Sequence, residues 1–403
     1  MNCPLQKRRC GGCSRLSVPY EKQARVKQDK VRALFGKSRA ILSMEDPTRY
    51  RNKVISAFAW DRSGLISGMY AFGTHFVLPT DDCLLENQRA DEIVCAARKA
   101  LADLNVKAFD ENKKTGLIRF VQVRRAMNTG EALVTLVFYQ DTEKIARAAA
   151  EKIMAACPDV RGVVLNVNDR EGSAVLGFRE KILAGEGTIR DTICGLSVLI
   201  SSRSFYQVNT AQAERLYASA VQMAELGKND FVIDAYCGIG IIGLLAAKRA
   251  KRVLGVELNG EAVRLAKENA KLNDAENIEF LQGDVEKVLK TRPEKPDAVF
   301  LDPPRAGCGE AFLAALCALA PQKIVYISCD VTTQRRDADF LEKNGYAIRR
   351  VQPVDMFPHT DHIENVVLLS KLDPDTHVSV VPNISELDTT ASENKATYGI
   401  YHG

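Results

Sequence analysis

A cysteine at the end of an apolar run is the first residue of this chain that could do chemistry. In "IVYISCD" (324–330), Ile324, Val325 and Ile327 predict a short buried strand with Cys329 at its carboxyl end. In open α/β sheets, that end of the strands forms the edge where ligands bind. Cys329 could therefore be a nucleophile or a packed thiol, and position alone leaves both interpretations open.

A glycine-rich segment, "DAYCGIGIIG" (234–243), is a second candidate site, and it follows the apolar run "FVI". Gly238, Gly240 and Gly243 form a G-x-G-x-x-G pattern, whose small residues let the backbone approach a ligand closely. Glu257 ends the next predicted strand and could accept hydrogen bonds from ribose hydroxyls. These features alone fit NAD at least as well as S-adenosylmethionine.

Carboxylates at the ends of successive predicted strands distinguish the two ligands. The four residues are Asp234, Glu257, Asp284 and Asp302. Such a row suits a cofactor with a cationic sulfonium, an amino group and a ribose diol, and it suits an anionic pyrophosphate poorly. Any one of these acids could be only a helix N-cap, but four in register favour S-adenosylmethionine.

Cysteines near the N-terminus form a third candidate site. Cys3, Cys10 and Cys13 make a C-x6-C-x2-C pattern in a chain with eleven cysteines. In a reducing compartment, such cysteines are more often ligands, nucleophiles or buried side chains than disulfides. Clustered thiolates suit tetrahedral sulfur ligation, and the spacing fits zinc and a [4Fe-4S] cluster equally.

The charge of the chain is unevenly distributed. The net charge is +4, yet residues 1–60 hold 14 Lys and Arg against 4 Asp and Glu. This excess could be a solvated helical face over residues 18–37 or a basic surface for a polyanion. No apolar run is long enough to span a bilayer, and the N-terminus lacks the apolar core of a signal peptide, so we expect a cytoplasmic protein.

The elements that must position these residues differ along the chain. Residues 52–190 alternate strand-like runs with helices near 87–104 and 142–156, which predicts an α+β region. The runs cover residues 53–60, 69–78, 116–124, 132–138 and 160–167. From about residue 229, short apolar strands alternate with helices, which predicts an α/β region with a parallel, doubly wound, Rossmann-like sheet. The segment after residue 371 is polar and turn-rich.

Several motifs in combination resemble the RNA 5-methyluridine methyltransferases over roughly residues 1–371. The motifs are "YRNKV" (50–54), "GLIRFVQVRR" (116–125), "FYQVNT" (205–210), "DAYCGIG" (234–240), "LDPPRAG" (301–307), "YISCD" (326–330) and "DMFPHTDHIENVVLL" (355–369). The resemblance implies that Cys329 is the nucleophile and Glu364 the base. It also implies a set of residues that contact S-adenosylmethionine, namely Gln207, Tyr236, Glu257, Asp284 and Asp302.

These residue types suit methylation of C5 of uracil. A thiolate that adds to C6 makes C5 electron-rich enough to take a methyl group, and a carboxylate then removes the C5 proton so that the thiolate can leave. The chain departs from the family at Asp330 and Val331, where related sequences usually have Asn-Pro. A carboxylate beside the thiol would raise the thiol pKa unless it is paired, and Arg335 and Arg336 are the expected partners.

The resemblance also completes the N-terminal cysteine group. It assigns Cys83 as the fourth ligand, and it implies a [4Fe-4S] cluster rather than zinc because the ribosomal-RNA branch carries such a cluster. We expect the cluster to hold the basic arm on the central domain, where the arm can contact RNA. We also expect the chain to lack the small β-barrel RNA-binding domain of many relatives.

We therefore predict four segments and one activity. The segments are a cysteine-cluster and basic arm (1–50), an α+β central RNA-binding domain (51–190), a Rossmann-like methyltransferase domain (191–371) and a polar tail (372–403). The predicted activity is C5 methylation of a uridine in a single-stranded loop of 23S rRNA, by a monomer that binds neither DNA nor membranes. The alternatives are a tRNA uracil-C5 methyltransferase, an NAD-dependent iron–sulfur oxidoreductase and a catalytically idle RNA-binding protein.

Overall fold

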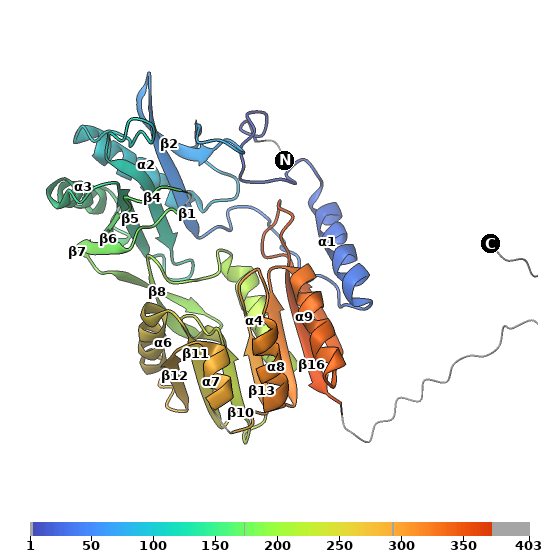
Figure 1. Cartoon of the computed structure of the whole chain (residues 1–403). Coiled ribbons are helices and arrows are strands. Elements are labelled where there is room, and N and C mark those ends of the chain that lie inside the picture. Colours follow the sequence, from blue (N-terminus) through green and yellow to red (C-terminus); the bar gives the residue numbers. More distant parts are fainter. Residues whose placement is uncertain (1–2, 173, 292–293, 373–403) are drawn as a thin grey trace, which may run out of the picture. The chain divides into compact units, whose positions relative to one another are not determined.

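The computed structural model describes residues 3–172, 174–291 and 294–372, and the described residues up to Lys371 form one compact unit. Within these ranges lie two seven-stranded sheets and one two-stranded sheet (Figure 1). No helix of the described ranges combines the length and apolar character needed to cross a membrane. The predicted tail, apart from Leu372, lies outside the described residues.

The basic arm contains helix α1 (Tyr20–Phe35), which the pattern over residues 18–37 predicts. Gln23 and Lys27 are one turn apart and lie on the buried side of this helix. The Lys27 ammonium is 2.6 Å from a carboxylate oxygen of Asp355, and both side chains are buried. Part of the predicted basic charge is therefore neutralised inside the fold.

The central sheet has the strand order β3-β2-β1-β4-β5-β6-β7. Its neighbouring strands are antiparallel except β5 and β6, which run parallel. Helices α2 and α3 pack against each other and against this sheet (Figure 1). The elements are β1 (Lys53–Asp61), β2 (Gly64–Tyr70), β3 (Val77–Pro79), α2 (Gln88–Asp103), β4 (Ile118–Arg125), β5 (Ala132–Phe138), α3 (Glu143–Ala156), β6 (Val160–Val167) and β7 (Arg179–Gly185).

Two features of this region differ from the sequence prediction. The prediction of one strand over residues 69–78 is wrong, because the chain turns between β2 and β3. Gly73 in that turn has a φ of 72°. Strand β7 was not predicted, because most of its side chains are exposed or half-buried and it lacks an apolar run. The hairpin of β8 (Thr188–Ile193) and β9 (Leu196–Ser201) was also not predicted.

The C-terminal sheet has the strand order β12-β11-β10-β13-β14-β16-β15. The first five strands are parallel, which confirms the predicted doubly wound α/β region, whereas β16 runs antiparallel to both of its neighbours. The elements are α4 (Thr210–Ala224), β10 (Phe231–Ala235), α5 (Ile241–Ala247), β11 (Arg252–Glu257), α6 (Gly260–Leu272), β12 (Ile278–Gln282), α7 (Val285–Thr291), β13 (Ala298–Leu301), α8 (Glu310–Leu319), β14 (Lys323–Ser328), α9 (Val331–Lys343), β15 (Tyr346–Val354) and β16 (Glu364–Lys371).

Alternating side chains of this sheet form two cores, one on each face. Val232 and Val366 belong to a cluster with residues of α4, α5 and α6. Their chain neighbours Ile233 and Val367 belong to a second cluster with residues of α1, α7, α8 and α9. Each fully buried side chain of this size contributes about 1.5–3 kcal/mol. This burial on both faces fixes the register of the strands, and with it the positions of the residues at their ends.

Candidate functional site

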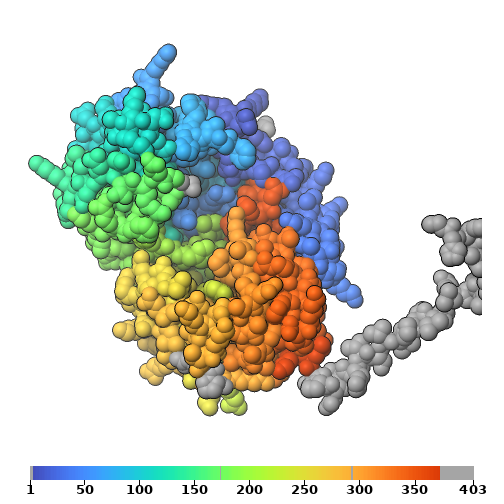
Figure 2. All heavy atoms as spheres, viewed as in Figure 1, coloured from blue at the N-terminus to red at the C-terminus, as the bar shows by residue number. Residues whose placement is uncertain are grey.

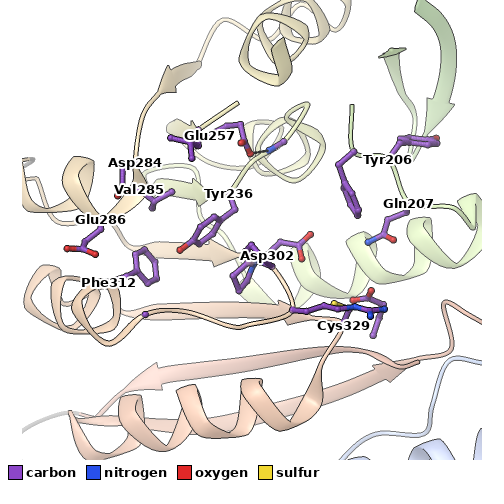
Figure 3. A pocket seen from close by; sticks show the side chains of 18 of the residues that line it. Tyr206, Gln207, Tyr236, Glu257, Asp284, Val285, Glu286, Asp302, Phe312 and Cys329 are labelled. Atoms are coloured by element: carbon purple, nitrogen blue, oxygen red, sulfur yellow. Dashed lines mark hydrogen bonds between the residues drawn. The ribbon is translucent and has the colours of Figure 1, made fainter. Parts of the chain in front are cut away.

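A cavity of about 770 Å³ opens at the carboxyl ends of the parallel strands. It lies beside β10 and β13, where the strand order reverses and where open α/β sheets bind ligands. The surface is hollowed between central-sheet residues, in blue and green, and C-terminal-sheet residues, in yellow and orange (Figure 2). The cavity brings together all seven residues predicted for catalysis and cofactor binding: Gln207, Tyr236, Glu257, Asp284, Asp302, Cys329 and Glu364. Figure 3 labels these residues apart from Glu364.

The glycine loop after β10 forms one wall of the cavity. Glu257 holds this loop, because its carboxylate accepts hydrogen bonds from the backbone N–H groups of Gly238, at 3.1 Å, and Asn259, at 2.8 Å. Tyr236 has a φ of 64°, in the left-handed region that non-glycine residues rarely adopt. Its ring lies 5.6 Å from that of Phe312, and both rings border the cavity (Figure 3). Such backbone strain is often found at functional sites.

Asp234 does not belong to the row of cavity acids, which corrects the sequence prediction. It is buried, and its carboxylate accepts a hydrogen bond of 2.7 Å from the backbone N–H of Gly243. Burial raises the pKa of Asp234 to about 8. Asp234 therefore holds the first turn of α5 and has a structural role instead of a ligand-binding one.

Asp284 and Asp302 both line the cavity but differ in their partners. Asp284 accepts a hydrogen bond of 3.2 Å from the backbone N–H of Lys287, at the start of α7. Burial alone raises the pKa of Asp302 to about 7, without a compensating donor among the described residues. The Asp302 carboxyl group, drawn at the centre of Figure 3, therefore has free capacity for a cationic or hydrogen-bonding ligand.

Gln207 reaches the cavity from the segment between β9 and α4. The side chain of Asn52 holds this segment, because its amide donates hydrogen bonds of 2.9 Å to the Gln207 carbonyl and to the Thr210 hydroxyl. Asn52 comes directly before β1, so the central sheet helps to position a residue of the cavity.

Cys329 and Glu364 lie at adjoining strand ends. Strands β14 and β16 are antiparallel neighbours in which Ser328 pairs with Asn365. Cys329 directly follows Ser328 at the end of β14, and Glu364 directly precedes Asn365 at the start of β16. Both side chains therefore border the same part of the cavity. This arrangement puts a thiol and a carboxyl group within reach of one small substrate group.

The sequence of this chain is similar to those of known RNA methyltransferases. A family model described as tRNA (Uracil-5-)-methyltransferase matches residues 287–372, and one described as TRM5/TYW2 methyltransferase domain matches residues 194–326. An uncharacterized RNA methyltransferase of Halalkalibacterium halodurans is 39% identical over 91% of this chain and 82% of the relative. One of Staphylococcus aureus is 38% identical over 90% of this chain and 82% of the relative. The chain belongs to the RNA 5-methyluridine methyltransferase family.

A solved structure shows that the fold is shared with this family. The tRNA (uracil-54, C5)-methyltransferase of Pyrococcus abyssi, in complex with S-adenosyl-L-homocysteine, has a TM-score of 0.74 and 24% sequence identity. The match covers 92% of this chain and 87% of that one. It supports the predicted Rossmann-like fold of an S-adenosylmethionine-dependent methyltransferase.

Arg305 is a cavity residue that the sequence analysis missed. Burial raises the pKa of the Cys329 thiol and the charge of Glu364 raises it further, whereas Arg305 lowers it by a hydrogen bond and by its charge. Burial also raises the pKa of Glu364 well above its usual range; Asp302 adds to this rise and Arg305 opposes it. Arg305 belongs to the family motif "LDPPRAG", so that motif could have identified it.

The expected pairing of Asp330 with Arg335 or Arg336 is wrong. Asp330 is the N-cap of α9, and its carboxylate accepts hydrogen bonds from the backbone N–H groups of Thr332, at 2.9 Å, and Thr333, at 3.2 Å. Both arginines pair with acids of their own helix. Asn and Asp are about equally good N-caps, so the departure from the family preserves this structural role.

The four N-terminal cysteines do not form a ligand set as the structure places them. All four are free thiols, and the described part of the chain contains no group of three or more His, Cys, Asp or Glu side chains that could hold a metal ion. Burial raises the pKa of Cys13, and the nearby Cys10 and Cys3 raise it further. Burial also raises the pKa of Cys83 to about 12. A metal centre at these cysteines therefore stays a prediction from the resemblance.

Proposed function

We propose that this chain transfers a methyl group from S-adenosylmethionine to C5 of a uridine in 23S rRNA, through a covalent bond between Cys329 and C6. The observation that carries this proposal is the position of Cys329 and Glu364 at adjoining strand ends in one cavity. Methylation of C5 needs a nucleophile at one side of the pyrimidine ring and a base close to it. Membership of the family supports the reaction class.

The rest of the cavity fits S-adenosylmethionine. Asp302 has a carboxyl group without a described donor, and Glu257 and Gln207 add acceptors around the glycine loop. These groups suit the cationic and hydroxyl-bearing parts of the cofactor. When bound, the cofactor supplies an electrophilic methyl group on a positively charged sulfur.

The first step proposed for the chain is the addition of Cys329 to the uracil. The thiol loses its proton to solvent in the open cavity, and Arg305 stabilises the thiolate by charge and hydrogen bonding. The thiolate forms a bond to C6, and the electron pair of the C5–C6 double bond moves to the O4 side as an enolate. C5 is then nucleophilic and can take the methyl group.

The second step is removal of the C5 proton by Glu364. The electron pair of the broken C5–H bond restores the C5–C6 double bond, and the bond to Cys329 breaks with departure of the thiolate. The uridine therefore exchanges one proton for one methyl group. Burial raises the pKa of Glu364, which makes its carboxylate a stronger base than an exposed one.

The order of these steps can be tested by trapping the adduct. In Glu364→Gln, attack and methyl transfer should proceed, but elimination should stall because an amide does not accept the C5 proton at neutral pH. A protein–RNA adduct that survives denaturing electrophoresis should accumulate when S-adenosylmethionine is present. The double variant with Cys329→Ala should form no adduct, and Glu310→Gln, at the exposed start of α8, should behave like the unchanged protein. Efficient turnover by Glu364→Gln without an adduct would assign the base elsewhere.

The RNA substrate has two candidates. The sequence resemblance to the ribosomal-RNA branch favours 23S rRNA, whereas the matched family model and the Pyrococcus abyssi structure are named for tRNA. Mapping 5-methyluridine in both RNAs from a deletion strain separates them. Loss from 23S rRNA alone supports the proposal, and loss from tRNA alone replaces it with the tRNA activity.

We also propose Cys3, Cys10, Cys13 and Cys83 as the ligands of a [4Fe-4S] cluster, as the resemblance implies. The positive charge of Arg51 lowers the pKa of Cys10 and Cys13, which favours their thiolate forms. No step of the methylation depends on this group.

A further inference from the structure

One residue of the cavity wall on the central-sheet side, Lys53, belongs to a pair of neighbouring cations. Lys53 begins β1 and lines the same cavity as Cys329 and Glu364. In the sheet it is the direct cross-strand partner of Arg124 on β4. Like charges at directly opposite positions of an antiparallel pair are destabilising. An anion bound at Lys53 would offset this repulsion.

Arg124 is held in place by groups that do not neutralise it. The side chain is 6% exposed, and its guanidinium donates hydrogen bonds to the backbone carbonyls of Ser202 and Ser204. Burial lowers the pKa of Arg124 to about 10, and the charges of Glu180 and Glu261 only partly oppose this. The guanidinium is thus a fixed positive charge on the strand next to Lys53, without an ion pair among the described residues.

Lys53 is likewise a cation without a described anionic partner. The ion pairs of the described chain do not include it, and no described side chain or carbonyl accepts a hydrogen bond from its ammonium group. Burial lowers the pKa of Lys53 to about 8, and Arg124 and Arg51 lower it further. Lys53 is half-buried and faces the cavity, so its ammonium group is open to an anion that enters there.

We propose that Lys53, backed by Arg124, binds a backbone phosphate of the substrate RNA beside the uridine that enters the cavity. This inference rests on the proposed function. A uridine withdrawn from its stack brings its own phosphodiester groups to the mouth of the cavity, and these are the anions that an RNA substrate supplies. Asn52, which precedes Lys53, also holds the Gln207 segment, so the phosphate site and the cofactor part of the cavity share one support.

The carboxylate of S-adenosylmethionine is the other anion that could reach this cavity, and binding measurements separate the two. Lys53→Met keeps the length of the side chain and removes its charge. In the Cys329→Ala background, which binds without turnover, this change should raise the Kd for RNA about tenfold. It should leave the Kd for S-adenosylhomocysteine, measured by calorimetry, unchanged. A weaker affinity for S-adenosylhomocysteine with unchanged RNA binding would overturn the proposal.

Salt dependence and stability give two further readouts. Loss of one phosphate contact should reduce the slope of log Kd against log salt concentration by about one. Lys53→Met should also raise the melting temperature, because it removes the repulsion of Arg124, and Lys53→Arg should retain RNA binding. The matched control is Lys144→Met, an exposed lysine on α3, which should change neither RNA binding nor the salt slope.

Failure of this inference is distinguishable from failure of the proposed function. If Lys53→Met binds RNA with unchanged affinity and salt slope while the unchanged enzyme methylates uridine, only the phosphate site is refuted. If the unchanged enzyme methylates no uridine, the proposed function fails whatever Lys53 does. With Cys329 intact, the change at Lys53 should raise the KM for RNA more than it lowers kcat.

Discussion

Cys329 and the cysteines near the N-terminus differ in what fixes their positions. Cys329 follows a strand that is paired on both sides, and Asp330, its neighbour, caps the next helix. Cys10 and Cys13, in contrast, lie in a loop whose main-chain contact with the central sheet includes an isolated bridge between Cys10 and Ala71. A nucleophile can thus be positioned by strand register alone. A set of four loop thiols needs something else to hold it, and the proposed cluster would do so.

Replacing the strand-end thiol should have the largest effect. Cys329→Ala should lower the methylation rate by about 10⁴- to 10⁶-fold, because C6 then has no attacking group. The measurement is methyl incorporation into the identified RNA. Cys317→Ala, on α8 and outside the cavity, should retain nearly full activity. Substantial activity of Cys329→Ala would remove the functional difference between Cys329 and the loop cysteines.

The pH dependence should show what activates that thiol. The pKa values of Cys329 and Glu364 are both raised, and both groups act in their deprotonated forms, so the rate should increase with pH above neutrality. Arg305→Ala should raise the thiol pKa further, move the rising limb of the profile to higher pH and lower the rate at pH 7 about tenfold. Arg305→Lys keeps the charge and should reverse most of the shift. An unmoved profile would show that Arg305 does not act on the thiol.

The loop cysteines should affect metal content more than chemistry. Protein purified without air should be brown, with about four irons per chain. Cys13→Ser should lose this iron and change kcat by no more than about twofold, because these cysteines do not line the cavity. Cys95→Ser, on α2, should retain the iron. Zinc without iron in the unchanged protein would rule out the cluster.

The cap beside Cys329 should give the smallest effect. Asp330→Asn retains an acceptor for the N–H groups at the start of α9, so the free energy of unfolding should change by less than about 0.5 kcal/mol. Asp330→Ala removes the acceptor and should cost about 1 kcal/mol, measured by urea unfolding. If Asp330→Asn lowered the free energy of unfolding as much as Asp330→Ala does, the negative charge of Asp330 would matter more than its hydrogen bonds to the helix.

Some of this site could be predicted from the sequence because its residues stand at strand ends. The apolar runs before Glu257, Asp302 and Cys329 are short and clearly bounded, and the order of the parallel strands then brings their ends together. The family motifs supplied Glu364 and Gln207, which have no such local signal. The activity of these residues stays a proposal.

Other features depend on contacts between distant segments, which composition does not reveal. Lys53 becomes significant only through its pairing with Arg124, 71 positions later in the chain. Asp234 looked like its neighbours at the strand ends, but its carboxylate turns to Gly243. Strand β7 was missed because its exposed side chains give no apolar period. Strand β16 lies between β14 and β15, although it follows both in the sequence, and no local pattern indicates this order.

The position of β16 has a consequence for the newly made protein. A ribosome releases the chain from its N-terminus, so β14 and β15 emerge before β16 (Glu364–Lys371). Until β16 enters the sheet, β14 has an open edge and Cys329 lacks the neighbouring Glu364. The last strand of the sheet thus completes the hydrogen bonding of the fold and brings the proposed base to the proposed nucleophile. Under the proposed mechanism, a nascent chain that stalls before Glu364 would carry the thiol without its base, so reactivity would wait for the whole domain.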